Sequence, residues 1–148
     1  MIKHIWTTLS KKSVIDSETN SLSIHDILEQ LNVDIKVDKD KPKPKEINIP
    51  IEFEVTSLWV KDEKNKSDVF EGFFSLDLIA PNGDKLSSFE NILNIPKENR
   101  RMRTRMKING LKLTNSGDYI FKLSYKGKND TKYKKVAEIP LEIFITQK

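Results

Sequence analysis

Apolar residues in this chain recur at every second position in short runs, and polar turns separate these runs. The clearest run spans residues 47–55, where apolar positions alternate with Asn48, Glu52 and Glu54. Because successive side chains on a strand point to opposite faces, one face collects every apolar member of the run. The pattern therefore predicts a half-buried strand whose inner face carries Ile47, Ile49, Ile51, Phe53 and Val55.

The same alternation predicts further strands at residues 4–9, 70–80, 85–95, 102–108, 118–125 and 136–145. Asn82 and Gly83 separate the second and third of these, and both tolerate the positive φ of a tight hairpin turn. Pro140 lies on the polar face of the last strand. Because proline has no amide hydrogen to donate, we expect an edge position or a bulge there.

Residues 23–31 fit two patterns. Ile24, Ile27, Leu28 and Leu31 have helical spacing, and Ser23 with Asp26 resembles a capping box. The alternation of Ile27, Leu31, Val33, Ile35 and Val37 favours a strand, and the strand at 4–9 needs a neighbour. We favour the strand and keep one short helix near residues 23–31 as the alternative. Residues 39–46, with two prolines, and residues 61–68 are predicted loops.

These elements predict an all-β fold in one domain spanning residues 1–148. We expect a single antiparallel sandwich of seven or eight strands. No internal repeat is visible in the sequence.

The segment "INGLKLTNSGDYIF" resembles the corner before the penultimate strand of immunoglobulin-like sandwiches. The matching positions are Leu113, Ser116, Gly117, Asp118 and Tyr119. The resemblance implies that the Tyr119 hydroxyl caps backbone near the turn and that its ring packs in the core. The chain lacks the two cysteines of antibody domains, and Trp59 is the counterpart of their core tryptophan. Residues 5–24 are also similar to small bacterial proteins of unassigned function, which supports the fold and says nothing of activity.

Little in the composition favours catalysis. The absence of cysteine removes disulfides, thiolate catalysis and zinc-finger sites, and the two histidines cannot form a three-histidine zinc centre. No phosphate-binding glycine loop, nucleophile elbow or metalloprotease motif occurs. Glu52 and Glu54 lie on the polar parity of their strand, so we interpret them as solvated. We therefore expect no enzyme activity, no cofactor and no metal.

No signal peptide is evident in residues 1–10, and no window contains the ~20 apolar residues needed to cross a bilayer. We accordingly expect a cytoplasmic protein that does not enter a membrane.

The net charge of +4 is concentrated in two segments. Residues 97–107 carry six cationic side chains and one glutamate, and residues 126–135 carry five lysines and one aspartate. The first segment holds every arginine of the chain: Arg100, Arg101, Arg103 and Arg105. Since a guanidinium binds carboxylate or phosphate with two parallel hydrogen bonds, this use of arginine suggests an anionic partner.

On a strand, Arg101, Arg103, Arg105 and Lys107 form one outward row, with methionines opposite them. Three things could balance the charge of this row: water, the carboxylates of a neighbouring strand such as the one with Glu52 and Glu54, or an anionic partner. These alternatives stay open. If the strand at 118–125 were its antiparallel neighbour, the row and the second basic segment would form one positive end.

We therefore expect a non-catalytic binding or accessory module that contacts another macromolecule through a sheet edge or a basic loop end. The partner is expected to be a protein, and an acidic one fits the charge; sequence-nonspecific nucleic-acid binding through the arginine row is the alternative. The oligomeric state is left open. The candidate binding residues are Arg100, Arg101, Arg103, Arg105, Lys107, Lys128, Lys132 and Lys134.

Overall fold

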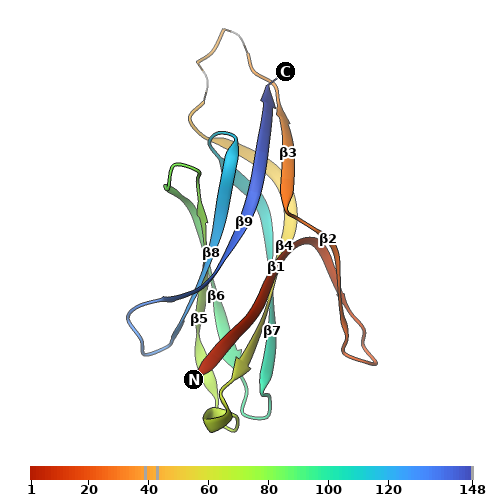
Figure 1. Ribbon diagram of the computed structural model, residues 1–148, viewed down its shortest axis with the longest axis vertical. Helices are drawn as coiled ribbons and strands as arrows, with labels where there is room; N and C mark the ends of the chain where they lie inside the picture. The colour runs from red at the N-terminus through yellow and green to blue at the C-terminus, as the bar shows by residue number, and fades with distance from the viewer. Residues whose placement is uncertain (39, 43, 148) are drawn as a thin grey trace.

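The computed structural model describes residues 1–38, 40–42 and 44–147, and nine strands in these residues form two sheets (Figure 1). The strands are β1 (Ile2–Ile15), β2 (Leu22–Ile27), β3 (Gln30–Ile35), β4 (Ile47–Lys61), β5 (Phe70–Ile79), β6 (Lys85–Ile95), β7 (Arg101–Leu113), β8 (Gly117–Gly127) and β9 (Lys134–Gln147). One 3-10 turn, η1 (Glu63–Asn65), follows β4.

The first sheet has the strand order β2-β1-β4-β7, and the second has the order β3-β9-β8-β5-β6. All neighbours are antiparallel except β3 and β9, which are parallel. The predicted all-β fold with two sheets is confirmed. The predicted single antiparallel sandwich of seven or eight strands is wrong, because nine strands form and the second sheet is mixed.

The region 22–35 explains the difference in strand number. It forms two short strands, and the helix considered for residues 23–31 is absent. Asp26 has a left-handed φ of 57°, and the chain then leaves β1 and continues alongside β9. Burial of Leu28, together with Leu31 and Val33 against the core, favours the extended chain over the helical spacing.

The core lies between the sheets and includes the fully buried rings of Trp59, Tyr119 and Phe121. Trp59 packs against Phe74, with ring centroids 6.2 Å apart. Tyr119 has the predicted corner role: its hydroxyl donates to the Asn115 carbonyl at 2.6 Å and accepts the Thr114 amide at 2.9 Å.

The predicted loops are only partly described. Lys39 and Lys43 of the 39–46 loop lie outside the described residues, and the described ones form no helix or strand. In the second predicted loop, Lys61 still belongs to β4.

Pro140 has the expected edge position, because β3 pairs with β9 only from Glu142 onward. No helix in the described part of the chain is long and apolar enough to cross a membrane.

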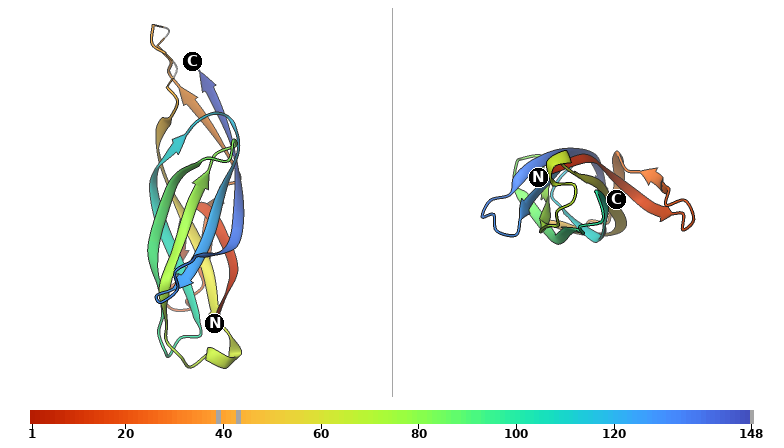
Figure 2. Two further views of the ribbon diagram at one scale, coloured as in Figure 1. Left: turned by 90° about the vertical axis from the view of Figure 1, so that its left-hand side faces the viewer. Right: turned by 90° about the horizontal axis from the view of Figure 1, so that it is seen from below.

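Two hairpins extend from opposite sides of the elongated body (Figure 2). One joins β8 to β9 and carries the lysine-rich segment. The other joins β1 to β2: β1 pairs with β4 as far as Ser10 and beyond that residue pairs only with β2. Beyond Ser10, the β1–β2 hairpin therefore separates from β4.

The pairing of the arginine strand with the 118–125 strand, which was the condition for a single positive end, does not occur. The chain crosses between sheets at the tyrosine corner, so β7 pairs with β4 whereas β8 pairs with β5 and β9. The segments 96–100 and 128–133 do leave the same end of the second sheet, since β6 and β8 both pair with β5, but β5 lies between them.

Candidate functional site

The arginine strand β7 has the predicted orientation at the edge of the first sheet. Arg101, Arg105 and Lys107 are exposed and Arg103 is partly exposed, whereas Met106 on the opposite face is buried. Met102 packs partly buried against the core. The cationic row therefore lies on the outer face of this sheet, next to the outward side chains of β4.

A tryptophan that the alternation did not assign to the outer face lies there with the row. Trp6 of β1 is opposite Leu58 of β4, which is opposite Arg103 of β7. The register shifts between His4 and Trp6, which indicates a β-bulge at Ile5. In a regular strand His4 and Trp6 would share a face; the bulge turns Trp6 outward while His4 stays against Trp59.

The β1–β2 hairpin folds over this outer face and contacts the arginines through neutral groups. Arg105 Nη1 donates to Ser13 Oγ at 3.2 Å and to the Ser13 carbonyl at 3.4 Å. Arg103 Nη1 donates to Asn20 Oδ1 at 3.5 Å. These contacts hold the hairpin to the sheet. Each of them, however, pairs a positively charged guanidinium group only with an uncharged oxygen atom.

The hairpin also covers Glu54, which is only 8% exposed. The Ser13 hydroxyl donates to the Glu54 carboxylate, and Glu54 is opposite Lys107 in the register. The expectation that Glu54 is solvated is therefore wrong, because it did not include a hairpin above β4. Glu52 is exposed, as expected.

Between the hairpin and the sheet lies a hollow of about 650 Å³. Its lining combines an aromatic ring, aliphatic side chains, amide groups and two guanidinium groups: Trp6, Asn20, Ser21, Leu22, Ile24, Leu58, Asn99, Arg101, Met102 and Arg103. Within the described residues the Arg101 side chain makes no hydrogen bond or ion pair. The hollow can therefore accept an anionic group beside an apolar surface.

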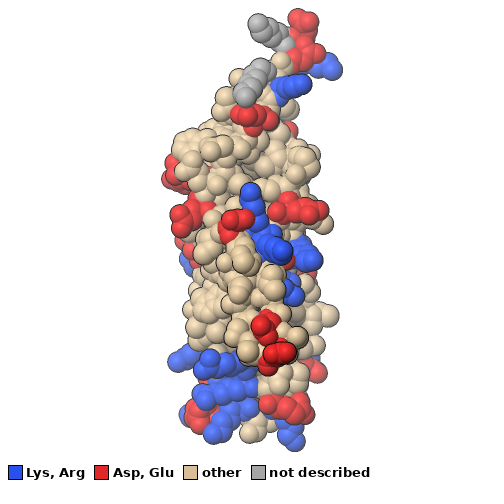
Figure 3. All heavy atoms as spheres, turned by 90° about the vertical axis from the view of Figure 1, so that its right-hand side faces the viewer, with Lys and Arg blue, Asp and Glu red and all other residues tan. Residues whose placement is uncertain are grey.

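Arg100 differs from Arg101 in having a carboxylate partner. Arg100 Nη2 pairs with Glu63 Oε2 at 2.9 Å. The hydrogen bond from Lys66 and the charges of Lys66 and Arg100 hold the Glu63 pKa below its usual value. Lys107 makes no ion pair with a described residue. Figure 3 shows lysine and arginine gathered toward one end of the face that carries the β1–β2 hairpin, with acidic groups near them.

The predicted lysines of the β8–β9 hairpin lie apart from the arginine row, and one of the three, Lys128, has an ion-pair partner. Lys128 Nζ pairs with Glu71 Oε2 at 2.5 Å. Lys126 Nζ lies 4.7 Å from the centre of the Tyr133 ring. Lys132 and Lys134 make no ion pair in the described chain. This hairpin and the arginine row do not form the single positive end that a pairing of the two strands would have produced.

Tyr133, the aromatic residue of the lysine-rich hairpin, contacts a carboxylate of its own chain. Its hydroxyl donates to the Glu90 carboxylate. Burial, followed by the hydrogen bond to Glu90 and that residue's charge, raises the Tyr133 pKa. Trp6 is therefore the better candidate for contact with a partner.

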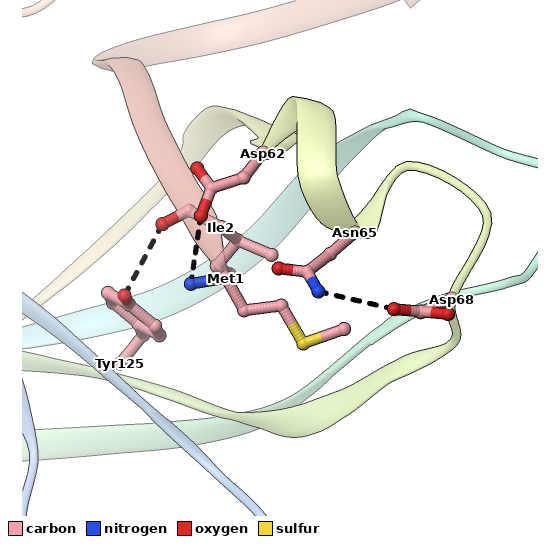
Figure 4. Close-up of polar contacts among 6 residues, drawn as sticks. All are labelled: Met1, Ile2, Asp62, Asn65, Asp68 and Tyr125. Carbon is pink, nitrogen blue, oxygen red and sulfur yellow. Dashed lines mark hydrogen bonds and ion pairs between the residues drawn. The ribbon is translucent and has the colours of Figure 1, made fainter.

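A polar cluster around the start of β1 has a structural role (Figure 4). The Met1 amino group lies 3.1 Å from Asp62 Oδ2, and the Tyr125 hydroxyl donates to the Ile2 carbonyl at 3.4 Å. Asn65 Nδ2 donates to Asp68 Oδ2 at 3.2 Å. The first two contacts link the start of β1 to Asp62 and to β8.

Among the described residues, no group of three or more His, Cys, Asp or Glu side chains is placed to hold a metal. His4 is partly buried, 2.5 Å from the Thr7 hydroxyl, and its ring packs edge-on against Trp59 at 5.3 Å. Burial lowers the His4 pKa. This environment fits a packed histidine.

The comparisons with known proteins give a distant likeness. No protein-family model and no curated protein matches the sequence. One similar solved structure is a family 123 glycoside hydrolase from Clostridium perfringens, studied for glycolipid glycan hydrolysis, with a TM-score of 0.49 and 12% identity. The match covers 98% of this chain and 28% of that protein's chain.

That neighbour contradicts the prediction that the chain is not an enzyme, because it is a glycoside hydrolase, and we do not retain the prediction. At this identity and TM-score, the likeness concerns the fold and assigns no reaction or substrate to this chain.

Proposed function

We propose that the chain is a binding or accessory module that contacts an acidic protein through the outer face of β7 and the hollow beside it. One observation supports this proposal most strongly. Arg103 and Arg105 contact only neutral oxygens, and Arg101 has no side-chain partner in the described residues.

A row of guanidinium groups without carboxylate partners has an electrostatic cost. Like charges at alternate positions of a strand lie roughly 7 Å apart and repel one another. Carboxylates pair with some other cations of the described chain, as Glu63 does with Arg100 and Glu71 with Lys128. A carboxylate-rich partner would give the row the charge-assisted hydrogen bonds that Ser13 and Asn20 cannot supply.

The lining of the hollow favours a protein over a bare anion. Leu22, Ile24 and Leu58 provide aliphatic surface, and Trp6 supplies an aromatic ring on the other side of Leu58 from Arg103. Aromatic and arginine side chains together are enriched at protein–protein interfaces. An acidic side chain could bind Arg101 while a neighbouring apolar group packs in the hollow.

A second candidate function is binding of single-stranded nucleic acid, and the outward Trp6 ring is what favours it. Binders of this kind combine a cationic groove with aromatic rings on which bases stack. The surface offers one such ring near the arginine row. It offers no second ring among the residues that line the hollow.

The test compares the native chain with an Arg101→Gln/Arg103→Gln double variant in anisotropy titrations against labelled polyglutamate and labelled oligo-dT. We expect polyglutamate to bind, and the double variant to bind it at least about tenfold more weakly, with a shallower salt dependence. Equal binding by both proteins would refute the proposal. Tighter binding of oligo-dT than of polyglutamate, with quenching of Trp6 fluorescence, would favour nucleic acid.

Two further expectations accompany the proposal. The immunoglobulin-like assignment is supported by the Tyr119 corner, and the likeness to small bacterial proteins stays a prediction. A cytoplasmic location likewise stays a proposal.

A further inference from the structure

The strand β7 presents its backbone as well as its arginines to a partner. It is the last strand of the first sheet, and among described residues it pairs only with β4. No second described strand is hydrogen-bonded to the N–H and C=O groups on its other side. Such an edge can bind an extended segment by main-chain hydrogen bonds.

The register shows which residues have these open backbone groups. The Lys61 amide donates to the Arg100 carbonyl at 2.9 Å, and the next pair along is Val60 with Arg101. Opposed residues in an antiparallel ladder alternate between hydrogen-bonded and non-hydrogen-bonded pairs. The pairs 60–101, 58–103, 56–105 and 54–107 are thus non-hydrogen-bonded, so Arg101, Arg103, Arg105 and Lys107 turn their N–H and C=O groups toward the open edge.

The same four residues therefore provide both the open backbone groups and the cationic side chains. A segment added to this edge would place the residue opposite each of them on the same outer face, within about 5.5 Å between Cβ atoms. Its intervening residues would lie on the inner side, next to Met102, Thr104 and Met106. These neighbours are buried or partly buried, so small or apolar residues suit them.

We infer that β7 binds an extended acidic segment of a partner protein by strand addition, with acidic residues at every second position opposite Arg101, Arg103, Arg105 and Lys107. The inference rests on the proposed function and specifies its partner. The cationic row disfavours pairing with neutral or basic strands. An alternating acidic strand would instead form four cross-strand ion pairs with the row.

The experiment uses two synthetic peptides of one composition. In the first, four glutamates alternate with threonine and valine; in the second, the four glutamates are contiguous. We expect the alternating peptide to bind the full chain at least about tenfold more tightly. Hydrogen exchange by NMR should then slow at the amides of Arg101, Arg103, Arg105 and Lys107. The amides of Met102, Thr104 and Met106, already bonded to β4, should change little.

Two controls accompany this experiment. The first changes only the peptide, and the second changes only the charge of two side chains of the protein. An alternating peptide N-methylated at the amides that face β7 should lose binding. An Arg101→Glu/Arg103→Glu variant should bind the alternating glutamate peptide much more weakly than the native chain does, and it should lose the preference for that peptide over an alternating lysine peptide, because two cations and two anions then share the row.

The outcomes separate the two proposals. If both isomers bind equally and no edge amide is protected, strand addition is wrong although acidic binding stands. If the protected amides belong to β6 or β3 instead, the assigned edge is wrong. If neither peptide binds at low salt, the proposed function fails as well.

Discussion

The chain has two positively charged segments of similar net charge, and they differ in how the rest of the protein balances them. In the β8–β9 hairpin, Lys128 pairs with Glu71, Lys135 pairs with Glu138, and Lys126 lies over the Tyr133 ring. On β7, by contrast, Arg103 and Arg105 contact only uncharged oxygens and Arg101 makes no side-chain contact of this kind with a described residue.

The difference shows that net charge alone is a poor guide to a binding surface. Lysines on an exposed hairpin are well hydrated, and their surface ion pairs contribute little to stability. Guanidinium groups at a sheet edge that line a hollow together with a tryptophan keep their hydrogen-bonding capacity for another molecule. We therefore expect the two segments to respond differently to equivalent substitutions.

Charge reversal should show the largest difference. The Arg101→Glu/Arg103→Glu variant should bind a labelled polyglutamate at least about a hundredfold more weakly, because two attractive contacts become repulsive. The matched Lys132→Glu/Lys134→Glu variant changes net charge equally and should lose less than about fivefold. Comparable losses in anisotropy titrations would mean that only overall charge matters.

Removal of a carboxylate should destabilise the protein more beside the arginine row than beside the lysine hairpin. Glu54 is buried beneath the β1–β2 hairpin and accepts from Ser13, so Glu54→Ala should lower the free energy of unfolding by about 1–3 kcal/mol. Glu71→Ala removes a solvent-exposed pair and should cost at most about 1 kcal/mol. Urea denaturation of both variants checks this, and equal costs would contradict the covered position of Glu54.

The stability of the β1 region should depend on pH near neutrality, unlike that of the lysine hairpin, which contains no histidine. Burial holds the His4 pKa below its ordinary value of 6.5, so the unfolded chain binds the proton more readily. Stability should therefore fall as pH drops from about 6.5 through the folded-state pKa. Thermal melts of the native chain between pH 7.5 and 5.5 should show this fall, and His4→Phe should reduce it; an unchanged slope would refute it.

The smallest effect is expected within the arginine cluster itself. Arg100 already pairs with Glu63, so Arg100→Gln should change polyglutamate binding by less than about threefold. The Glu63 pKa should rise toward its ordinary value, although by less than on loss of Lys66, which has the larger influence. NMR titration of the Glu63 carboxyl carbon measures the shift, and a large loss of binding would place Arg100 within the contact surface.

The strand alternation was sufficient to predict most strands and the orientation of β7, because each face of a two-layer β fold has a consistent polarity. Period-two patterns at residues 47–55 and 102–108 correspond to parts of β4 and β7. The Tyr119 corner was also predictable, since the local motif determines its hydrogen bonds.

The remaining features depend on contacts between distant residues. The bulge at Ile5 turns Trp6 outward, and the alternation of residues in β1 contains no signal for it. Burial of Glu54 follows from the path of the β1–β2 hairpin. The pairing of β7 with β4 rather than β8 depends on where the chain crosses between sheets. Trp6 could have been found only by noticing an aromatic residue beside polar threonines in the first strand.

The most direct test of the arginine surface uses the fact that the chain has only four arginines, all between residues 100 and 105. Their four Nε–H resonances can be assigned with single arginine-to-lysine variants and followed by NMR during addition of polyglutamate. Our account predicts that the Arg101 and Arg103 signals shift together with saturation, while the Arg100 signal, held by Glu63, stays in place. Movement of Arg100 alone, or no movement of any guanidinium signal while polyglutamate binds, would contradict the account.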